Sequence, residues 1–207
     1  KTRKLEYLMA HALAGGADTL VTCGAIQSNH CRLTLAAALK EGLKCHLILE
    51  ERVPGTYNKK ASGNNLLFEI LGAESITVVE KGTNLKEKME RLASSLKEQG
   101  KRPYIIPGGG SNPIGATGYT SCFLEMLEQF KEQEIHPSTI VCTSGSSGTH
   151  AGLAAGLLST GADIRLVGIS IMRQQKEQQE LVLGLAQKTT EHLRVEKPMP
   201  DNFIEVI

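Results

Sequence analysis

The sequence predicts an α/β protein built from parallel sheets flanked by helices, and three observations support this prediction. Short apolar runs alternate with longer segments of helical periodicity along the whole chain, a pattern typical of βαβ units. The 207 residues include 41% hydrophobic side chains, enough for one large domain or two small ones. Glycine is abundant, with 21 residues, while aromatic residues make up only 4%, as expected for helices packed closely on sheets with many tight loops.

The apolar runs are predicted to be the strands, because each is short and is followed by glycine, proline or polar residues. The predicted strands cover residues 18–23, 44–49, 75–79, 103–106, 138–142 and 165–171, and residues 203–207 resemble a strand that is just beginning.

The intervening segments are predicted to be helices, because their apolar residues recur every three or four positions. In the first of them Leu5, Leu8 and Met9 lie on one stripe, and Gly15 follows its end. The predicted helices cover residues 2–13, a segment from about 30 to about 40, and residues 64–71, 85–99, 114–133, 151–158 and 174–192. A domain boundary is expected in the glycine-rich stretch 107–113.

Charge and cysteine content exclude several function classes. The 23 Lys and Arg against 22 Asp and Glu leave a net charge of +1, which argues against a nucleic-acid partner. No apolar run is long enough for a membrane span and the N-terminus lacks a signal-peptide pattern, so we expect no membrane partner. The 5 cysteines are scattered without a CxxC pair, which predicts no metal site, no disulfide framework and reduced thiols in the cytoplasm.

The loop TSGSSGT at 143–149 is the first candidate site, because it joins a predicted strand to a predicted helix. Small residues allow several backbone N–H groups to converge, and the helix N-terminus adds partial positive charge. The hydroxyl groups of Ser144, Ser146, Ser147 and Thr149 can add donors, which together suit a phosphate. The alternative is an ordinary flexible turn, and the loop matches neither the Walker A pattern nor GxGxxG.

A second loop, at 24–30, also follows a predicted strand, at the sheet edge where ligands bind in open α/β folds. Its residues Gln27, Ser28, Asn29 and His30 suit a carboxylate or a phenolic oxygen; the alternative is a helix cap supplied by Ser28 or Asn29. The basic segment KTRK at 1–4 is either functional or a solvated helix face. The segment PGGGSNP at 107–113 either approaches a ligand or acts as a hinge.

Taken together, these segments resemble one family. KTRKLEY at 1–7, QSNH at 27–30, PYIIPGGGS at 103–111, PIGATGY at 113–119 and GSSGTHAG at 145–152 occur in one order. The chain is similar over essentially its whole length to the D-cysteine desulfhydrase and 1-aminocyclopropane-1-carboxylate deaminase family. This resemblance implies pyridoxal 5'-phosphate as cofactor, the tryptophan synthase β-like fold (fold type II), a small amino-acid substrate and a cytoplasmic homodimer.

The resemblance also implies a domain organisation. Residues 4–111 would form the smaller α/β domain, while 1–3 and 112–207 would be part of the larger cofactor-binding domain, with the site in the cleft. The family's sequences contain segments before the position of Lys1 and after the last predicted strand that have no counterpart here. We therefore expect a fragment with unpaired sheet edges and exposed apolar faces, and we expect it to be poorly active by itself.

Roles for individual residues follow from the same resemblance. Lys1 corresponds to the lysine that forms the Schiff base with the cofactor, and Lys4 would lie near the phosphate. Ser28 would be the catalytic hydroxyl near the substrate, with Asn29 near the cofactor's ring hydroxyl and the substrate carboxylate, and His30 beside them as a substrate-binding residue. The residues that match the phosphate loop are Ser146, Ser147, Gly148 and Thr149.

The reaction implied is the α,β-elimination of D-cysteine to pyruvate, hydrogen sulfide and ammonia. Within the family, 1-aminocyclopropane-1-carboxylate deaminase and L-cysteate sulfo-lyase are the alternatives. The deaminase usually has glutamine where this chain has His30 and His150, which favours the desulfhydrase or the related sulfo-lyase. An alternative of another class is a non-catalytic module that binds a phosphorylated metabolite, and it would not need Lys1.

Overall fold

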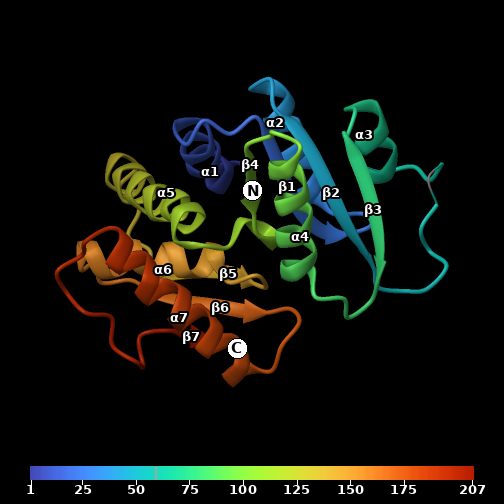
Figure 1. Ribbon diagram of the computed structural model, residues 1–207. Helices are drawn as coiled ribbons and strands as arrows, with labels where there is room; N and C mark the ends of the chain where they lie inside the picture. Colours follow the sequence, from blue (N-terminus) through green and yellow to red (C-terminus); the bar gives the residue numbers. More distant parts are fainter. Residues whose placement is uncertain (59) are drawn as a thin grey trace. The chain divides into compact units, whose positions relative to one another are not determined.

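The computed structural model describes residues 1–58 and 60–207 and divides into two compact units, Lys1–Gly109 and Gly110–Ile207. Helices and strands alternate in both, and every pairing between strands is parallel, so the predicted α/β class is confirmed (Figure 1). The assignment of residues 4–111 to a smaller domain, and of 1–3 and 112–207 to a larger one, stays a prediction.

Unit 1 is built on a four-stranded sheet with the strand order β3-β2-β1-β4. The strands are β1 (Thr19–Ala25), β2 (Lys44–Glu51), β3 (Ser75–Glu80) and β4 (Pro103–Ile106). Strand β1 is central and pairs with β2 on one side and with β4 on the other. The loops that follow β1 and β4 therefore start beside each other at the carboxyl edge of the sheet, where ligands bind in such folds.

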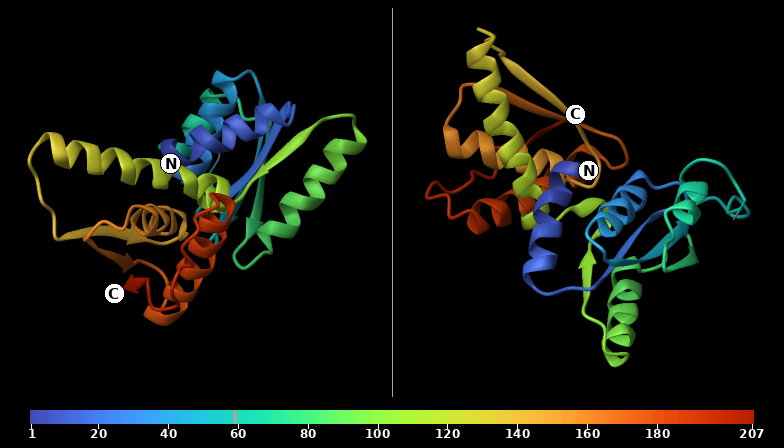
Figure 2. Two further views of the ribbon diagram at one scale, coloured as in Figure 1. Left: turned by 90° about the vertical axis from the view of Figure 1, so that its left-hand side faces the viewer. Right: turned by 90° about the horizontal axis from the view of Figure 1, so that it is seen from above.

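Four helices cover this sheet: α1 (Thr2–Ala14), α2 (Asn29–Lys40), α3 (Asn64–Ile70) and α4 (Leu85–Glu98). Helix α4 lies on one face and the other three lie on the opposite face (Figures 1 and 2). Right-handed crossovers in this strand order require α2 and α3 to lie opposite α4. Under α4 the core contains Val21, Ile48, Met89 and Leu96. A short 3₁₀ turn at Gly108–Gly110 follows β4.

Unit 2 has a three-stranded sheet in the order β5-β6-β7. The strands are β5 (Thr139–Ser144), β6 (Arg165–Ser170) and β7 (Glu205–Val206), and the helices are α5 (Pro113–Glu132), α6 (Gly148–Thr160) and α7 (Gln175–His192). Helix α6 is buried against α5 at two glycines. A Cβ on Gly152 would lie 2.2 Å from the Ala116 carbonyl oxygen, and one on Gly156 would lie 2.8 Å from Cβ of Phe123, so only glycine permits this approach.

Helix α6 begins at Gly148 rather than at the predicted residue 151. The reason is Ser147, whose φ of 68° turns the chain straight from the loop into the helix. Left-handed backbone at a residue other than glycine is uncommon and was not apparent in the sequence. Gly148 and Thr149 therefore belong to the first helical turn, and the loop itself ends at Ser147.

Several features bear on function classes. No helix in the described ranges is both long and apolar enough to cross a membrane. All five cysteines are free thiols. Within residues 1–58 and 60–207, no three His, Cys, Asp or Glu side chains gather in a way that could hold a metal ion.

Candidate functional site

In unit 1, two lysines at the start of α1, the N-cap Lys1 and Lys4 in the first turn, meet the glycine turn that follows β4. Lys4 is buried, with only 1% of its surface exposed, and its Nζ donates to the Gly109 carbonyl at 3.1 Å. Nζ of Lys1 lies 3.5 Å from the same oxygen. The lysines are three positions apart on one helix, so they lie on the same face and share this acceptor.

Burial changes the acidity of both amines, because an ammonium ion loses solvation away from water. Burial lowers the pKa of Lys1. It also lowers the pKa of Lys4, to about 7, with the positive charge of Lys1 as the second cause. The site therefore holds an amine that is readily available in the uncharged, nucleophilic form near neutral pH.

His30, in the first turn of α2, is buried next to these lysines. Its Nε2 lies 2.9 Å from Oγ1 of Thr22, which donates its single proton to the Ile106 carbonyl at 2.8 Å. Thr22 must therefore accept toward the ring, so Nε2 carries the proton and Nδ1 is a bare acceptor. Burial, followed by the charges of Lys1 and Lys4, lowers the pKa of His30 to about 3. The imidazole is consequently neutral, and its Nδ1 has no partner among the described residues.

Ser28 caps α2, since its Oγ accepts from the Cys31 N–H at 3.1 Å. The capping interpretation of this loop is thus correct for Ser28. Capping uses a lone pair of the oxygen and leaves the hydroxyl proton to donate elsewhere, so the cap does not exclude a role toward a ligand. Gly24 makes room for it, because a Cβ there would lie 2.4 Å from the Ser28 oxygen.

Asn29 and Gln27 are tied to Asn64, at the start of α3. Nδ2 of Asn64 donates to the Gln27 carbonyl at 2.8 Å and to Oδ1 of Asn29 at 2.9 Å. Its backbone N–H donates to Oε1 of Gln27 at 2.8 Å. Asn64 therefore fixes the loop after β1, a role that no motif in the sequence signals.

In unit 2, the loop after β5 presents hydroxyl groups and backbone amides. Oγ of Ser111 donates to Oγ of Ser146 at 2.9 Å and accepts from the Gly148 N–H at 3.3 Å. Oγ of Ser147 donates to the Ser146 carbonyl at 2.6 Å. The N-cap residue of α6, Ser147, makes no side-chain cap hydrogen bond, and the first N–H groups of a helix lack partners within the helix. This end of α6 is therefore suited to an anion.

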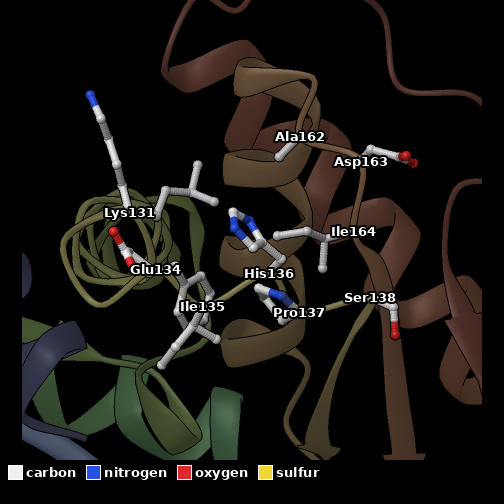
Figure 3. Close-up of a pocket in the computed structure, with 11 residues that line it drawn as sticks. Lys131, Glu134, Ile135, His136, Pro137, Ser138, Ala162, Asp163 and Ile164 are labelled. Carbon is white, nitrogen blue, oxygen red and sulfur yellow. The ribbon is translucent and has the colours of Figure 1, made fainter.

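A separate hollow of about 770 Å³ lies at the opposite ends of β5 and β6. Figure 3 shows His136 and Ile164 among its lining residues, which precede β5 and β6 respectively. The loop with Ser146 and Ser147 follows β5 instead, so the hollow is not part of the candidate site.

The structure thus brings Lys1, Lys4 and His30 together in unit 1, and brings Ser146 and Ser147 together with Gly148 at the start of α6 in unit 2. Reasoning from sequence missed Thr22, Asn64 and Ser111 as partners of these residues. Thr22 and Asn64 lie in other elements and carry no motif of their own. Ser111 belongs to a segment recognised only as a glycine-rich loop.

Comparisons with known proteins show which family the chain belongs to. A D-cysteine desulfhydrase of Klebsiella pneumoniae (strain 342) is 43% identical over 197 residues, which are 95% of this chain and 60% of that protein. One from Salmonella typhi is 44% identical over 188 residues, or 90% of this chain and 57% of that protein. The chain therefore spans about 60% of the length of these curated relatives.

A crystal structure described as an ACC deaminase homologue matches with a TM-score of 0.87 and 36% identity, covering 99% of this chain and 60% of that one. The family model for pyridoxal-phosphate dependent enzymes matches residues 1–205. With the parallel α/β architecture already described, these matches confirm the predicted fold class. The chain belongs to the family of pyridoxal-phosphate dependent enzymes.

Proposed function

We propose that this chain is part of a D-cysteine desulfhydrase, a lyase that converts D-cysteine to pyruvate, hydrogen sulfide and ammonia with pyridoxal 5'-phosphate. One observation carries the proposal: curated D-cysteine desulfhydrases are 43–44% identical over 90–95% of the chain. The positions of Lys1 and His30, described above, are consistent with it.

The donor groups present fit the cofactor. A phosphate monoester needs several N–H and O–H donors. The loop in unit 2 offers the Ser146 hydroxyl, which accepts from Ser111 and keeps its own proton to donate, together with the N–H groups at the start of α6, whose N-cap makes no side-chain hydrogen bond. An aldehyde needs an uncharged amine, and burial lowers the pKa of Lys1 in that direction. We propose that Lys1 binds the cofactor covalently and that Ser146, Ser147, Gly148 and Thr149 hold its phosphate.

When bound, the cofactor supplies a ring that accepts electron density from the substrate Cα. Residues of the chain itself then carry out the proton transfers. Nζ of Lys1 would take the proton from the substrate Cα, because its lowered pKa makes it a competent base. Loss of the thiolate from Cβ, followed by hydrolysis, gives pyruvate and ammonia. Lys4, also implied near the phosphate, would keep the site electropositive whenever it is protonated.

His30, Ser28 and Asn29 are proposed to orient the substrate. Neutral His30 offers an acceptor at Nδ1, which suits an ammonium or hydroxyl proton. Ser28 keeps a hydroxyl proton available while it caps α2, which suits a carboxylate oxygen. Asn29 engages Asn64 through Oδ1 and keeps its own amide N–H groups for donation.

The proposal is tested on the intact gene product loaded with pyridoxal 5'-phosphate. D-cysteine is expected to release equal amounts of pyruvate and sulfide. Borohydride reduction followed by peptide mapping is expected to place the pyridoxyl label on Lys1. A protein that binds the cofactor without any label on Lys1 would instead be the non-catalytic binding module.

The ACC deaminase homologue among the matched structures favours 1-aminocyclopropane-1-carboxylate deaminase as the second candidate. The two candidates separate by product, because the cyclopropane substrate yields 2-oxobutyrate and no sulfide. Release of 2-oxobutyrate from that substrate, with no sulfide from D-cysteine, would replace the first candidate by the second.

The resemblance to the family also supports a cytoplasmic homodimer, and we include both features in the proposal. Analytical ultracentrifugation of the intact protein is expected to give twice the monomer mass. Cell fractionation is expected to recover the activity with the cytoplasmic enzymes rather than with membranes.

A further inference from the structure

Three polar side chains from three different elements are buried directly beneath the phosphate loop of unit 2. Ser144 ends β5, His150 lies in the first turn of α6, and Gln178 lies in the second turn of α7. Their exposed fractions are 1%, 0% and 0% respectively. Burying a polar group is costly unless it is hydrogen-bonded, so the contacts of these residues need an explanation.

Gln178 is the centre of this cluster. Its Nε2 donates to Oγ of Ser144 at 2.9 Å and to the Gly145 carbonyl at 3.2 Å. Its Oε1 accepts from Nη1 of Arg173 at 3.2 Å, and the same nitrogen donates to the Gly145 carbonyl at 2.9 Å. The first carbonyl of the loop is therefore held by two side chains from outside the loop.

His150 completes the cluster from the other side. Its Nδ1 lies 3.3 Å from the Ser144 hydroxyl oxygen, and burial lowers the pKa of the ring to about 4, so the imidazole is neutral. The imidazole fits because residue 168 on β6 is a glycine. A Cβ at this position would lie 2.3 Å from Nδ1 of His150 and 3.1 Å from Cβ of Ser144.

The loop above this cluster needs such support. Ser147 has a φ of 68°, a conformation that costs energy for any residue with a Cβ and persists only where its surroundings fix it. The cluster holds the loop at both ends: at Ser144 and Gly145, where the loop begins, and at His150, just after it ends. The amides and hydroxyls above are thereby held ready for an anion before one arrives.

We propose that Gln178, together with Ser144 and His150, is a positioning network that preorganises the loop for the phosphate group of the cofactor. The inference rests on the proposed function. It adds Gln178, which belongs to none of the motifs, and it gives Ser144 and His150 a supporting role in place of a contact with the ligand. None of the three residues is assigned a contact with the cofactor itself. They act through the backbone of the loop, and their effect is specific to the phosphate.

The test compares two ligands that differ only in that group, pyridoxal 5'-phosphate and pyridoxal, titrated into the intact apoprotein. In Gln178→Met the dissociation constant for the phosphorylated ligand is expected to rise about tenfold, the cost of about one hydrogen bond to a preorganised group. The constant for pyridoxal is expected to change less than about twofold. Activity is not needed for this readout.

The matched control is Gln179→Met, at the next position of the same helix. Nε2 of Gln179 donates to the Ile204 carbonyl at 2.8 Å, so this variant loses a hydrogen bond of similar length away from the loop. It is expected to keep the preference for the phosphorylated ligand. A second variant, Ser144→Ala, removes less volume and is expected to reduce the preference about threefold even if Gln178→Met does not fold.

Two results would overturn the inference, and they are distinguishable. If the wild type binds pyridoxal 5'-phosphate while Gln178→Met and Ser144→Ala keep the full phosphate preference, the network is only structural, whatever its effect on melting temperature. If the wild type itself does not bind pyridoxal 5'-phosphate, the proposed function fails, and the positioning role fails with it.

Discussion

The two candidate ligand-binding regions are built from different chemistry. In unit 1, the groups are two lysine amines and the imidazole next to them. Lys4 is almost wholly buried, and burial lowers the pKa values of Lys1 and His30. In unit 2, the groups around the loop are mostly uncharged, namely serine hydroxyls, backbone amides, a glutamine amide and a neutral imidazole. Arg173, which braces the loop from one side, is the exception.

The two regions are therefore suited to different tasks: unit 1 supplies a reactive amine, and unit 2 fixes the geometry of a binding loop. Burying an amine destabilises its charged form, which costs folding free energy but leaves a nucleophile near neutral pH. A neutral network supplies no nucleophile, but it fixes geometry at little electrostatic cost. Variants of the buried lysines in unit 1 should therefore change chemistry and pH dependence, while variants of the network in unit 2 should change ligand affinity and packing.

The largest effect is expected from Lys1→Ala in the intact protein. Removing the amine proposed to bind the cofactor and move the Cα proton should lower the rate of pyruvate formation from D-cysteine by about 10⁴-fold or more. It should also abolish borohydride-stable labelling. Lys97→Ala, at an exposed position of α4, is the control, and both readouts should stay at the wild-type level. A Lys1→Ala enzyme with more than a tenth of wild-type activity would contradict the proposed role.

The pH dependence of stability should show the buried cation of unit 1. The pKa of Lys4 is lowered from 10.5 to about 7, so between these pH values the unfolded state binds more protons than the folded state and stability rises with pH. For the apoprotein, urea unfolding at pH 7 and pH 10 should differ by on the order of 3 to 5 kcal/mol from this group.

Relative to the wild type, Lys4→Met should reduce the change in stability between pH 7 and pH 10 by about that amount, and Lys97→Met should leave the change as it is. The comparison between variants is needed because burial raises the pKa values of four thiols from 9.0, and their opposing contribution is shared by all three proteins; the thiols are Cys23, Cys31, Cys45 and Cys142. The buried imidazoles His30 and His150, with pKa values lowered from 6.5 to about 3 and about 4, contribute mainly near and below pH 6.5, so the comparison is made above pH 7. An unchanged slope in Lys4→Met would show that the buried lysine does not titrate in this range.

In unit 2, Gly168→Ala should be destabilising by about 3 kcal/mol, since overpacking of a filled core has this order of cost. The added methyl would meet His150 at 2.3 Å. Gly184→Ala is the matched control: a Cβ there meets nothing within 4 Å, and the site is inside α7, so the change should be neutral or stabilising by up to about 1 kcal/mol. Equal melting temperatures for the two variants would refute the tight packing around His150.

The smallest effect is expected from Asn64→Ala, which releases the loop after β1 from α3. Losing the Asn64 side-chain bonds to Gln27 and Asn29 should lower the free energy of unfolding by about 1 to 2 kcal/mol and raise KM more than it lowers kcat. Asn202→Ala, at an exposed turn, provides the comparison. A fall in kcat with no change in KM would show that Asn64 acts on the chemistry rather than on the loop.

Most of the architecture was predictable from the sequence, because strand and helix periodicities differ and glycines follow the helices. The strand at residues 103–106 has its predicted bounds, and most other ends differ by one to three residues. The start of α6 was wrong because it depends on the left-handed Ser147, which nothing in the sequence of a serine-rich loop reveals.

The candidate site was predictable only where the chain itself brings residues together. Lys1 and Lys4 are three positions apart and residues 27–30 are consecutive, so the sequence shows each group as a unit, although their roles followed only from the resemblance to the family. The bonds from Gln178 to Ser144 and from Asn64 to Asn29 join residues 34 and 35 positions apart. Only folding creates such pairs, and a glutamine or asparagine in a helix carries no mark of its partner.

The space that Gly168 leaves for His150 also restricts the order in which these two positions can change. A Cβ at position 168 would meet the imidazole at 2.3 Å and Cβ of Ser144 at 3.1 Å, so most of the conflict disappears when residue 150 becomes smaller, whereas a smaller residue at 150 needs no prior change at 168. Changing position 150 first should therefore cost less stability than changing position 168 first. The double variant His150→Ser with Gly168→Ala should fold better than Gly168→Ala alone, so the order in which the two positions change affects the stability of the intermediate.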